Sequence, residues 1–152
     1  MNRIIIALAS GLGAGYSPVA PGSVGSLIAI PLVLSFLALP LTTYIATVNT
    51  FIFMSYWVSD QARQIYKVND APQIVIDEIA GMLLVFIGQD PGLLTIATGF
   101  LIFRVLDVWK PWPCRWIDTQ LHNGYGIVLD DVVAGLYANA LLWILGYFFP
   151  QI

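Results

Sequence analysis

The fold is decided by residues 24–59, which read VGSLIAIPLVLSFLALPLTTYIATVNTFIFMSYWVS. This segment contains no Asp, Glu, Lys, Arg or His, and Pro40 divides it in two. Proline ends a helix because it lacks a backbone N–H and restricts the residue before it. We therefore predict helices over 24–39 and 41–59. Both are apolar on every side, which is typical of helices that face lipid or the interior of a bundle.

Charge is scarce along the whole chain and is confined to one region. The 152 residues include six Lys and Arg and nine Asp and Glu, or 10% charged residues, where a soluble domain has about 25%. Every charged residue except Arg3 lies between Asp60 and Asp131. A hydrophobic content of 59% excludes intrinsic disorder, and a net charge of −3 argues against nucleic acid as a partner. The single Cys114 and the single His122 exclude a multi-Cys or His-rich metal cluster.

These features favour one membrane domain over residues 1–152, with an all-α fold and about four to five apolar helices. The remaining helices are predicted over 74–89, 92–109 and 131–149. The segment 74–89 is short for a full crossing, which needs about 20 residues. A Gly/Pro-rich loop covers 10–26, and we expect Ser23 or Ser26 to cap the helix after it. A turn is expected at 89–92.

The order of the helices predicts how they are oriented in a membrane. If the loop at 10–26 lies on one side, successive crossings return the chain to that side at 60–73 and at 104–131. Every Lys and Arg then lies on this side, and the opposite side carries only Asp90. The positive-inside rule makes the basic side cytoplasmic.

Acidic residues gather at the cytoplasmic ends of the predicted helices. They are Asp77, Glu78, Asp107, Asp130 and Asp131. Carboxylates at such depths are costly unless they are paired or bind a cation, and five that converge would repel one another. Oxygen ligands favour Mg²⁺, Mn²⁺ or Ca²⁺ over zinc. The pattern therefore predicts a site for a divalent cation.

Basic residues accompany this acidic group. Arg104, Asp107 and Lys110 can share one helix face, and Arg115 can fold back over the same site after a Pro-rich turn. Guanidinium and ammonium groups suit an anionic phosphate monoester. The N-terminal loop, at Gly22 and Ser23, offers backbone N–H groups to the same phosphate. Its spacing matches neither a dinucleotide fingerprint nor a P-loop.

The same residues also have structural interpretations. The two acidic pairs fit helix N-termini, and Asp107 fits an ion pair with Arg104 or Lys110. The tryptophans of segment 109–116 suit an anchor at the membrane interface. Acids and bases on one side of the membrane together favour the metal-phosphate interpretation.

Four motifs in the sequence are long and occur in a fixed order. They are GLGAGYSPVAPGSVGSL at 11–27, IVIDEIAGM at 74–82, FRVLDVWKPWPCRWID at 103–118 and GYGIVLDDVVAGLYA at 124–138. Together they resemble the phosphatidylglycerophosphatase A family of bacterial membrane phosphatases, over essentially the whole chain. The resemblance implies Mg²⁺-dependent hydrolysis of phosphatidylglycerophosphate to phosphatidylglycerol and inorganic phosphate.

The resemblance also implies a role for each charged residue. The implied metal ligands are Asp77, Glu78, Asp107, Asp130 and Asp131, and all of these except Asp130 are also implied as catalytic. The implied phosphate contacts are Lys110, Arg115 and, as a further contact, Arg104. We expect Glu78 or Asp131 to accept the proton of the attacking water. The expected partners are the membrane and an anionic phospholipid substrate, with no obligate protein partner, and the expected location is the bacterial inner membrane with the site facing the cytoplasm.

Two other functions were weighed against this one. A phosphotransferase that uses CDP-activated lipid would need a D-G-x₂-A-R…G…D…D spacing, which the sequence lacks. A non-enzymatic membrane transporter or assembly protein would carry its charges at mid-depth and not at helix ends on one side. The sequence therefore favours the phosphatase.

Overall fold

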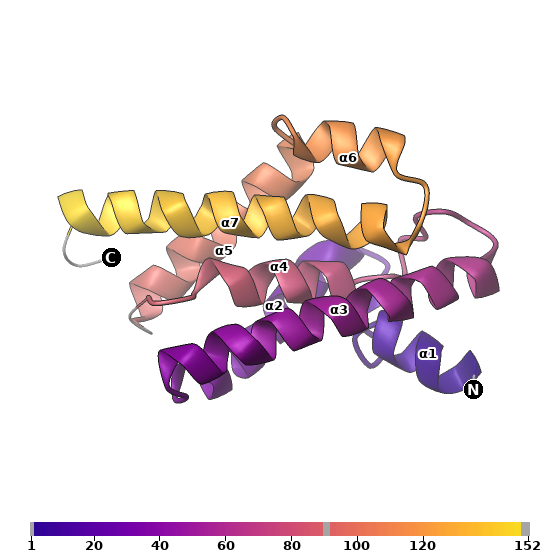
Figure 1. Ribbon diagram of the computed structural model, residues 1–152, viewed down its shortest axis with the longest axis horizontal. Helices are drawn as coiled ribbons and strands as arrows, with labels where there is room; N and C mark the ends of the chain where they lie inside the picture. The colour runs from indigo at the N-terminus through magenta and orange to yellow at the C-terminus, as the bar shows by residue number, and fades with distance from the viewer. Residues whose placement is uncertain (1, 90–91, 150–152) are drawn as a thin grey trace.

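The computed structural model describes residues 2–89 and 92–149, and these form an all-α bundle without strands (Figure 1). The elements are α1 (Asn2–Ala9), the 3₁₀ turn η1 (Ala14–Tyr16), α2 (Pro21–Leu37), α3 (Leu41–Tyr66), α4 (Ile76–Val85), α5 (Leu93–Trp109), α6 (Cys114–Gln120) and α7 (Gly124–Phe148). The predicted all-α class is confirmed. The predicted turn at 89–92 includes Asp90 and Pro91, which lie outside the described residues.

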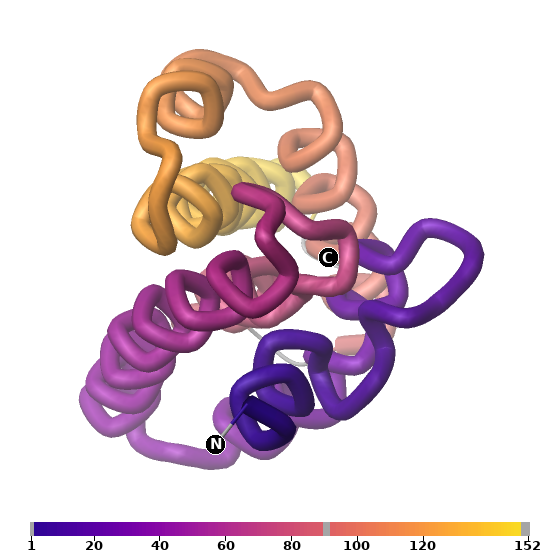
Figure 2. Tube along the Cα trace, turned by 90° about the vertical axis from the view of Figure 1, so that its right-hand side faces the viewer, coloured from indigo at the N-terminus to yellow at the C-terminus, as the bar shows by residue number. Residues whose placement is uncertain are grey.

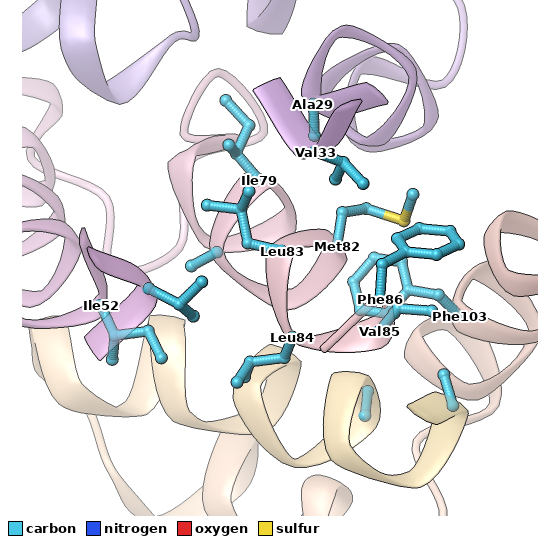
Figure 3. Packing of buried hydrophobic residues seen from close by; sticks show 14 of the residues in the cluster. Ala29, Val33, Ile52, Ile79, Met82, Leu83, Leu84, Val85, Phe86 and Phe103 are labelled. Carbon is cyan, nitrogen blue, oxygen red and sulfur yellow. The ribbon is translucent and has the colours of Figure 1, made fainter. Parts of the chain in front are cut away.

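Helix α4 is the centre of the bundle. Its sequence is apolar apart from Asp77 and Glu78, and all of its residues except Glu78 are buried. Its most extensive contacts are with α7, and it also packs against α2, α3 and α5. In Figure 3, Met82 lies beside Val33 of α2, and Phe86 lies beside Phe103 of α5.

The predicted helix over 74–89 is wrong at both ends. Helix α4 has 10 residues, which correspond to a length of about 15 Å. It ends early because the side chain of Asn139 on α7 donates to the carbonyl oxygens of Val85 and Ile87, at 2.8 and 3.0 Å. These carbonyls therefore have partners outside their own helix, and α4 spans only part of the bundle.

Two glycines bring α4 and α7 close together. A Cβ at Gly135 of α7 would lie 2.5 Å from the carbonyl oxygen of Gly81, and a Cβ at Gly81 would lie 2.8 Å from the carbonyl oxygen of Asp131 on α7. No larger residue fits either position unless the helices separate. This contact sets the position of the acidic turn of α7 relative to the start of α4.

The N-terminal region is more helical than the sequence predicts. Residues 2–9 form α1, and α2 begins at Pro21, so the Gly/Pro-rich loop covers 10–20. Neither Ser23 nor Ser26 caps α2. The N-cap is Ala20, at φ +45° and without a side-chain cap, and the Ser26 hydroxyl donates to the Gly22 carbonyl inside the helix at 3.0 Å. Proline suits the first turn of a helix, where its missing N–H would have no partner, so α2 starts at Pro21 without a polar cap.

The helices around the polar segments also extend beyond their predicted ends. Helix α3 continues through Asp60 to Tyr66, and the segment 110–130 contains α6. Helix α7 begins at Gly124 and not at 131, because the Asn123 side chain accepts from the Gly126 N–H at 3.1 Å and caps it. Asp130 and Asp131 therefore lie inside α7.

Within the described residues, α7 is the one helix long and apolar enough to cross a membrane, and 44% of its most apolar stretch is buried by the rest of the protein. Helix α2 is apolar but shorter. This supports one candidate span. The crossings by four or five helices stay a prediction.

Candidate active site

A polar cavity of about 250 Å³ lies where several helix ends meet. Two of the segments that reach it, the start of α7 and the chain between α3 and α4, lie at the end of the bundle that faces the viewer in Figure 2. The elements that reach it are the first turns of α2 and α4, the last turns of α5, the N-terminal part of α7 and the segment between α3 and α4. The charged residues that line it are Asp70, Asp77, Glu78, Arg104, Asp107, Lys110, Asp130 and Asp131. Helices that alternate in direction thus bring residues distant in sequence to one end.

Three carboxylates lie close enough together to share one cation. Asp77, Glu78 and Asp131 each offer an oxygen, and these oxygens all lie within 4.8 Å of one another. Asp77 and Asp131 are buried, with side chains from different helices. Among the described residues, Asp77 Oδ1, Glu78 Oε2 and Asp130 Oδ1 are buried and have no hydrogen-bond partner.

Such an arrangement is unfavourable for a protein without a bound cation. Buried carboxylates repel one another and each loses its hydration, so they need a counter-charge or protonation. Closely spaced carboxylate oxygens with free lone pairs are the ligands that hard divalent cations take. The residues present therefore fit a divalent metal.

Gly22 allows Glu78 to enter this cluster. A Cβ at Gly22 would overlap Glu78 Oε1 and would lie 3.2 Å from an Arg104 nitrogen. The first turn of α2 can approach the carboxylate and the guanidinium only because this position has no side chain.

Arg104 is held against the acidic cluster by two contacts. Its Nη1 lies 2.5 Å from Asp107 Oδ2 and 3.3 Å from the hydroxyl of Ser26. Arg104 Nε is buried and has no partner within the part of the chain that the structure describes. The ion-pair interpretation of Asp107 is thus confirmed, with Arg104 and not Lys110 as its partner.

Lys110 joins α5, α6 and α7 at the rim of the cavity. Its Nζ lies 2.7 Å from Asp130 Oδ2 and 3.0 Å from Asp118 Oδ1. Burial alone would lower the pKa of this ammonium, but the carboxylates of Asp130 and Asp118 outweigh burial and hold the pKa above its usual range. Two of its three donors are engaged, so one remains for a ligand.

The structure does not bring every predicted site residue into the cavity. All five predicted acids line it, together with Arg104, Lys110 and Gly22. Arg115 lines an adjacent groove, and Ser23 is not among the residues that line the cavity.

Two acidic residues that the sequence interpretation set aside as loop charges belong to this region. Asp70, in the segment between α3 and α4, lines the cavity, and Asp118 on α6 pairs with Lys110. The position of Asp118 at the end of the third motif, FRVLDVWKPWPCRWID, was a signal that could have identified it.

The helix N-terminus interpretation fits Asp77 and Glu78 but not Asp130 and Asp131. Asp130 and Asp131 lie in the second turn of α7, which Asn123 caps. Asp77 and Glu78 lie in the first turn of α4, whose N-cap is Val75 and which has no side-chain cap. Their side chains face the cavity at these positions.

The fold and the cavity define a helical-bundle protein with carboxylates for a cation and basic groups for an anion at one end of the bundle. The comparison with known families names the class more closely. The chain belongs to the phosphatidylglycerophosphatase A family, whose model matches residues 7–146.

Three curated relatives cover most of this chain. Phosphatidylglycerophosphatase A of Escherichia coli strain K12 is 40% identical over 144 residues, which are 94% of this chain and 84% of that protein. Phosphatidylglycerophosphatase A of Haemophilus influenzae is 32% identical over 92% of this chain and 87% of that protein. A Bacteroides thetaiotaomicron protein with the provisional name phosphatidylinositol-3-phosphatase is 32% identical over 93% of this chain and 95% of that protein. No solved structure matches the chain.

Proposed function

We propose that the acidic cavity is the active site of a Mg²⁺-dependent phosphatidylglycerophosphatase. The reaction is the one that the family performs, hydrolysis of phosphatidylglycerophosphate to phosphatidylglycerol, with release of inorganic phosphate. The observation that carries the proposal is the group of three carboxylates, Asp77, Glu78 and Asp131, with oxygens within 4.8 Å of one another. In Asp77 and Glu78, one buried oxygen has no hydrogen-bond partner among the described residues.

In this proposal the carboxylates hold the metal. Asp77, Glu78 and Asp131 are its nearest ligands, and Asp107 and Asp130 complete the acidic wall while they orient Arg104 and Lys110. When bound, Mg²⁺ polarises a phosphoryl oxygen and makes a water molecule more acidic. The choice of Mg²⁺ follows from the all-oxygen donors and from the family.

The remaining charged residues act on the phosphate and on the water. Lys110 has a free donor and Arg104 a free Nε, so both can compensate the negative charge that develops on the phosphoryl group. Glu78 or Asp131 accepts the proton of the attacking water. Gly22 brings the backbone of α2 to the same cavity. Ser23 does not line the cavity, so it has no part in the proposed phosphate contacts.

We further propose that the bundle is a multi-pass protein of the cytoplasmic membrane, in which α2, α3, α5 and α7 cross and α4 is a buried partial span. The outer faces of these helices carry large exposed apolar side chains, among them Leu34, Phe53, Leu101, Leu141, Trp143 and Ile144. Within the described residues, the end opposite the cavity has no charged residue, whereas Arg63, Lys67, Arg104 and Lys110 lie towards the cavity end. The positive-inside rule then directs the cavity to the cytoplasm.

The proposal requires an anionic phospholipid substrate and the membrane as partners, and no nucleic acid or obligate protein partner. A transporter is disfavoured by the collection of the charged groups at one end of the bundle. A phosphotransferase is disfavoured because its motif is missing from the sequence.

The test is phosphate release from phosphatidylglycerophosphate by the detergent-purified protein, with Mg²⁺ and with a chelator. We expect release only with the metal, and loss of release in Asp77→Asn, Asp107→Asn and Asp131→Asn. Asp60→Asn is the matched control, because Asp60 pairs with Arg63 outside the cavity. Near-normal rates in all three cavity variants would overturn the assignment of the site.

A further inference from the structure

A second concave surface adjoins the acidic cavity. It is a groove of about 600 Å³ where α5 turns into α6, and we call it the tryptophan groove. Its lining residues are Trp109, Lys110, Pro111, Trp112, Arg115, Trp116 and Thr119. Lys110 lines both the groove and the cavity, so the two sites are continuous at this side chain.

The aromatic side chains of the groove are unusually open for their size. Trp109 is 73% exposed, Trp112 79% and Trp116 53%. Their apolar bodies and polar N–H groups suit the boundary between lipid headgroups and acyl chains. A groove of this composition can take both the glycerol region of a phospholipid and the first part of its chains.

Arg115 supplies the charge of this groove. It is exposed and makes no salt bridge with a carboxylate in the described ranges 2–89 and 92–149, whereas the other two basic groups nearby, Arg104 and Lys110, are both paired. Such a guanidinium, which lies among aromatic side chains, can donate to two oxygens of one phosphate. It does not face the acidic cavity, so this phosphate is not the one at the metal ligands.

The substrate offers a second phosphate of the right kind. Phosphatidylglycerophosphate carries a terminal phosphate monoester and, one glycerol unit away, a phosphodiester that joins the headgroup to the lipid. Hydrolysis removes only the monoester and leaves the diester on the product. Two anionic groups separated by a short linker match two cationic sites that meet at Lys110.

We propose that the tryptophan groove is the subsite for the phosphodiester of the lipid substrate, with Arg115 as its anion-binding residue. This inference rests on the proposed function of the adjacent cavity. Arg115 thereby makes the protein selective for a phosphate monoester attached to a glycerophospholipid, while Lys110, at the junction, contacts the group that is hydrolysed.

The two fragments of the substrate allow the two sites to be tested separately. Phosphatidylglycerol carries only the diester, and inorganic phosphate corresponds to the monoester. Binding of each to the purified full chain is measured in neutral detergent micelles, as direct binding and as competitive inhibition of hydrolysis. In Arg115→Gln we expect about tenfold weaker binding of phosphatidylglycerol, since hydrogen bonds to charged groups are lost, and unchanged binding of inorganic phosphate. The KM for phosphatidylglycerophosphate should rise by a similar factor with little change in kcat.

Controls separate this role from a general effect of charge. Arg115→Lys should recover part of the binding, and Arg63→Gln, which removes an arginine from α3 outside the groove, should leave both ligands unaffected. A long-chain fatty acid, which is anionic and apolar but has no phosphodiester, should compete less well than phosphatidylglycerol.

Three results would overturn the inference. The first is loss of inorganic phosphate binding in Arg115→Gln with phosphatidylglycerol binding intact, which would assign Arg115 to the phosphate that leaves. The second is equal competition by the fatty acid, which would make the groove a general site for anionic lipid. The third is unchanged binding of both ligands. If the wild-type protein released no phosphate, the proposed function would fail, but the direct binding of phosphatidylglycerol would still decide the role of the groove.

Discussion

Lys110 Nζ lies 2.7 Å from Asp130 Oδ2, and this contact ties the end of α5 to the second turn of α7 at the rim of the cavity. The pair holds an ammonium beside the metal ligands, with one donor still available for a phosphate. Asp130 in turn depends on Lys110, because its other carboxylate oxygen, Oδ1, is buried and has no partner in the part of the chain that the structure describes.

Replacing Lys110 by Met should lower phosphate release by about 10²-fold, the usual loss when one preorganised stabilising group is removed. Steady-state rates on phosphatidylglycerophosphate measure this loss, and thermal unfolding checks that the variant is folded. Lys110→Arg keeps the charge and should retain more activity. Lys67→Met, at an exposed position outside the cavity, is the control. Equal rates in Lys110→Met and Lys67→Met would remove Lys110 from the site.

Replacing Gly22 by Ala should weaken the response to Mg²⁺. The added Cβ overlaps Glu78 Oε1, so the carboxylate must move away from Asp77 and Asp131. A displaced ligand typically costs 10- to 100-fold in metal affinity, by order of magnitude, and we expect the midpoint of Mg²⁺ activation to rise by roughly that factor. Gly146→Ala is the control, since a Cβ there meets nothing within 4 Å. An unchanged midpoint in Gly22→Ala would show that activation by Mg²⁺ does not depend on the present position of the Glu78 carboxylate.

Gly135→Ala should destabilise the bundle, whereas Gly146→Ala on the same helix should not. The new methyl group at 135 lies 2.5 Å from the Gly81 carbonyl oxygen, where the backbone of α4 cannot yield without a shift of the helix. We expect a loss of about 1–3 kcal/mol from overpacking in Gly135→Ala, against a gain of up to about 1 kcal/mol from helix propensity in Gly146→Ala. Denaturant unfolding in detergent compares the two, and similar stabilities would contradict the close packing of α4 and α7.

Asn139→Ala tests how α4 is ended. The variant removes both donors to the Val85 and Ile87 carbonyls and should cost about 1–3 kcal/mol of unfolding free energy, because these acceptors lose their partners. Asn49→Ala is a matched control, since Asn49 lies at an exposed position of α3 and donates to the Ile45 carbonyl within the same helix. If Asn139→Ala loses no more unfolding free energy than Asn49→Ala, water replaces the hydrogen bonds from Asn139 to the two carbonyls.

The long apolar segments between proline and polar residues predicted the all-α class, and the placement of the few charges predicted where the polar end lies, because both depend on residue type alone. Helix ends were harder to predict. Asn139 ends α4 from another helix, and Asn123 starts α7 earlier than the acidic pair suggests. Such ends depend on tertiary contacts that single-sequence patterns do not contain.

The candidate site, like the fold, could be predicted where it depends on residue type and could not where it depends on tertiary contacts. The charged residues of the motifs could be selected from the sequence, and the cavity collects all five acids with Arg104 and Lys110. The sequence could not show that Arg115 and Lys110 line different surfaces. The turn at 110–113 decides this, and it places Lys110 at both the cavity and the groove but Arg115 at the groove alone. Asp118 was missed because its partner, Lys110, lies outside its own helix, and Asp70 because the fold, and not the sequence, brings its segment to the cavity.

The most direct test of the central claim is a calorimetric titration of Mg²⁺ into the detergent-purified protein, without substrate, for the wild type and for Asp131→Asn. Asp131 joins α7 to the two acids of α4, so its carboxylate completes the metal site. We predict saturable binding to the wild type and binding weakened by at least about tenfold in Asp131→Asn. Binding isotherms that are the same for both proteins would contradict the claim that these buried carboxylates hold the metal.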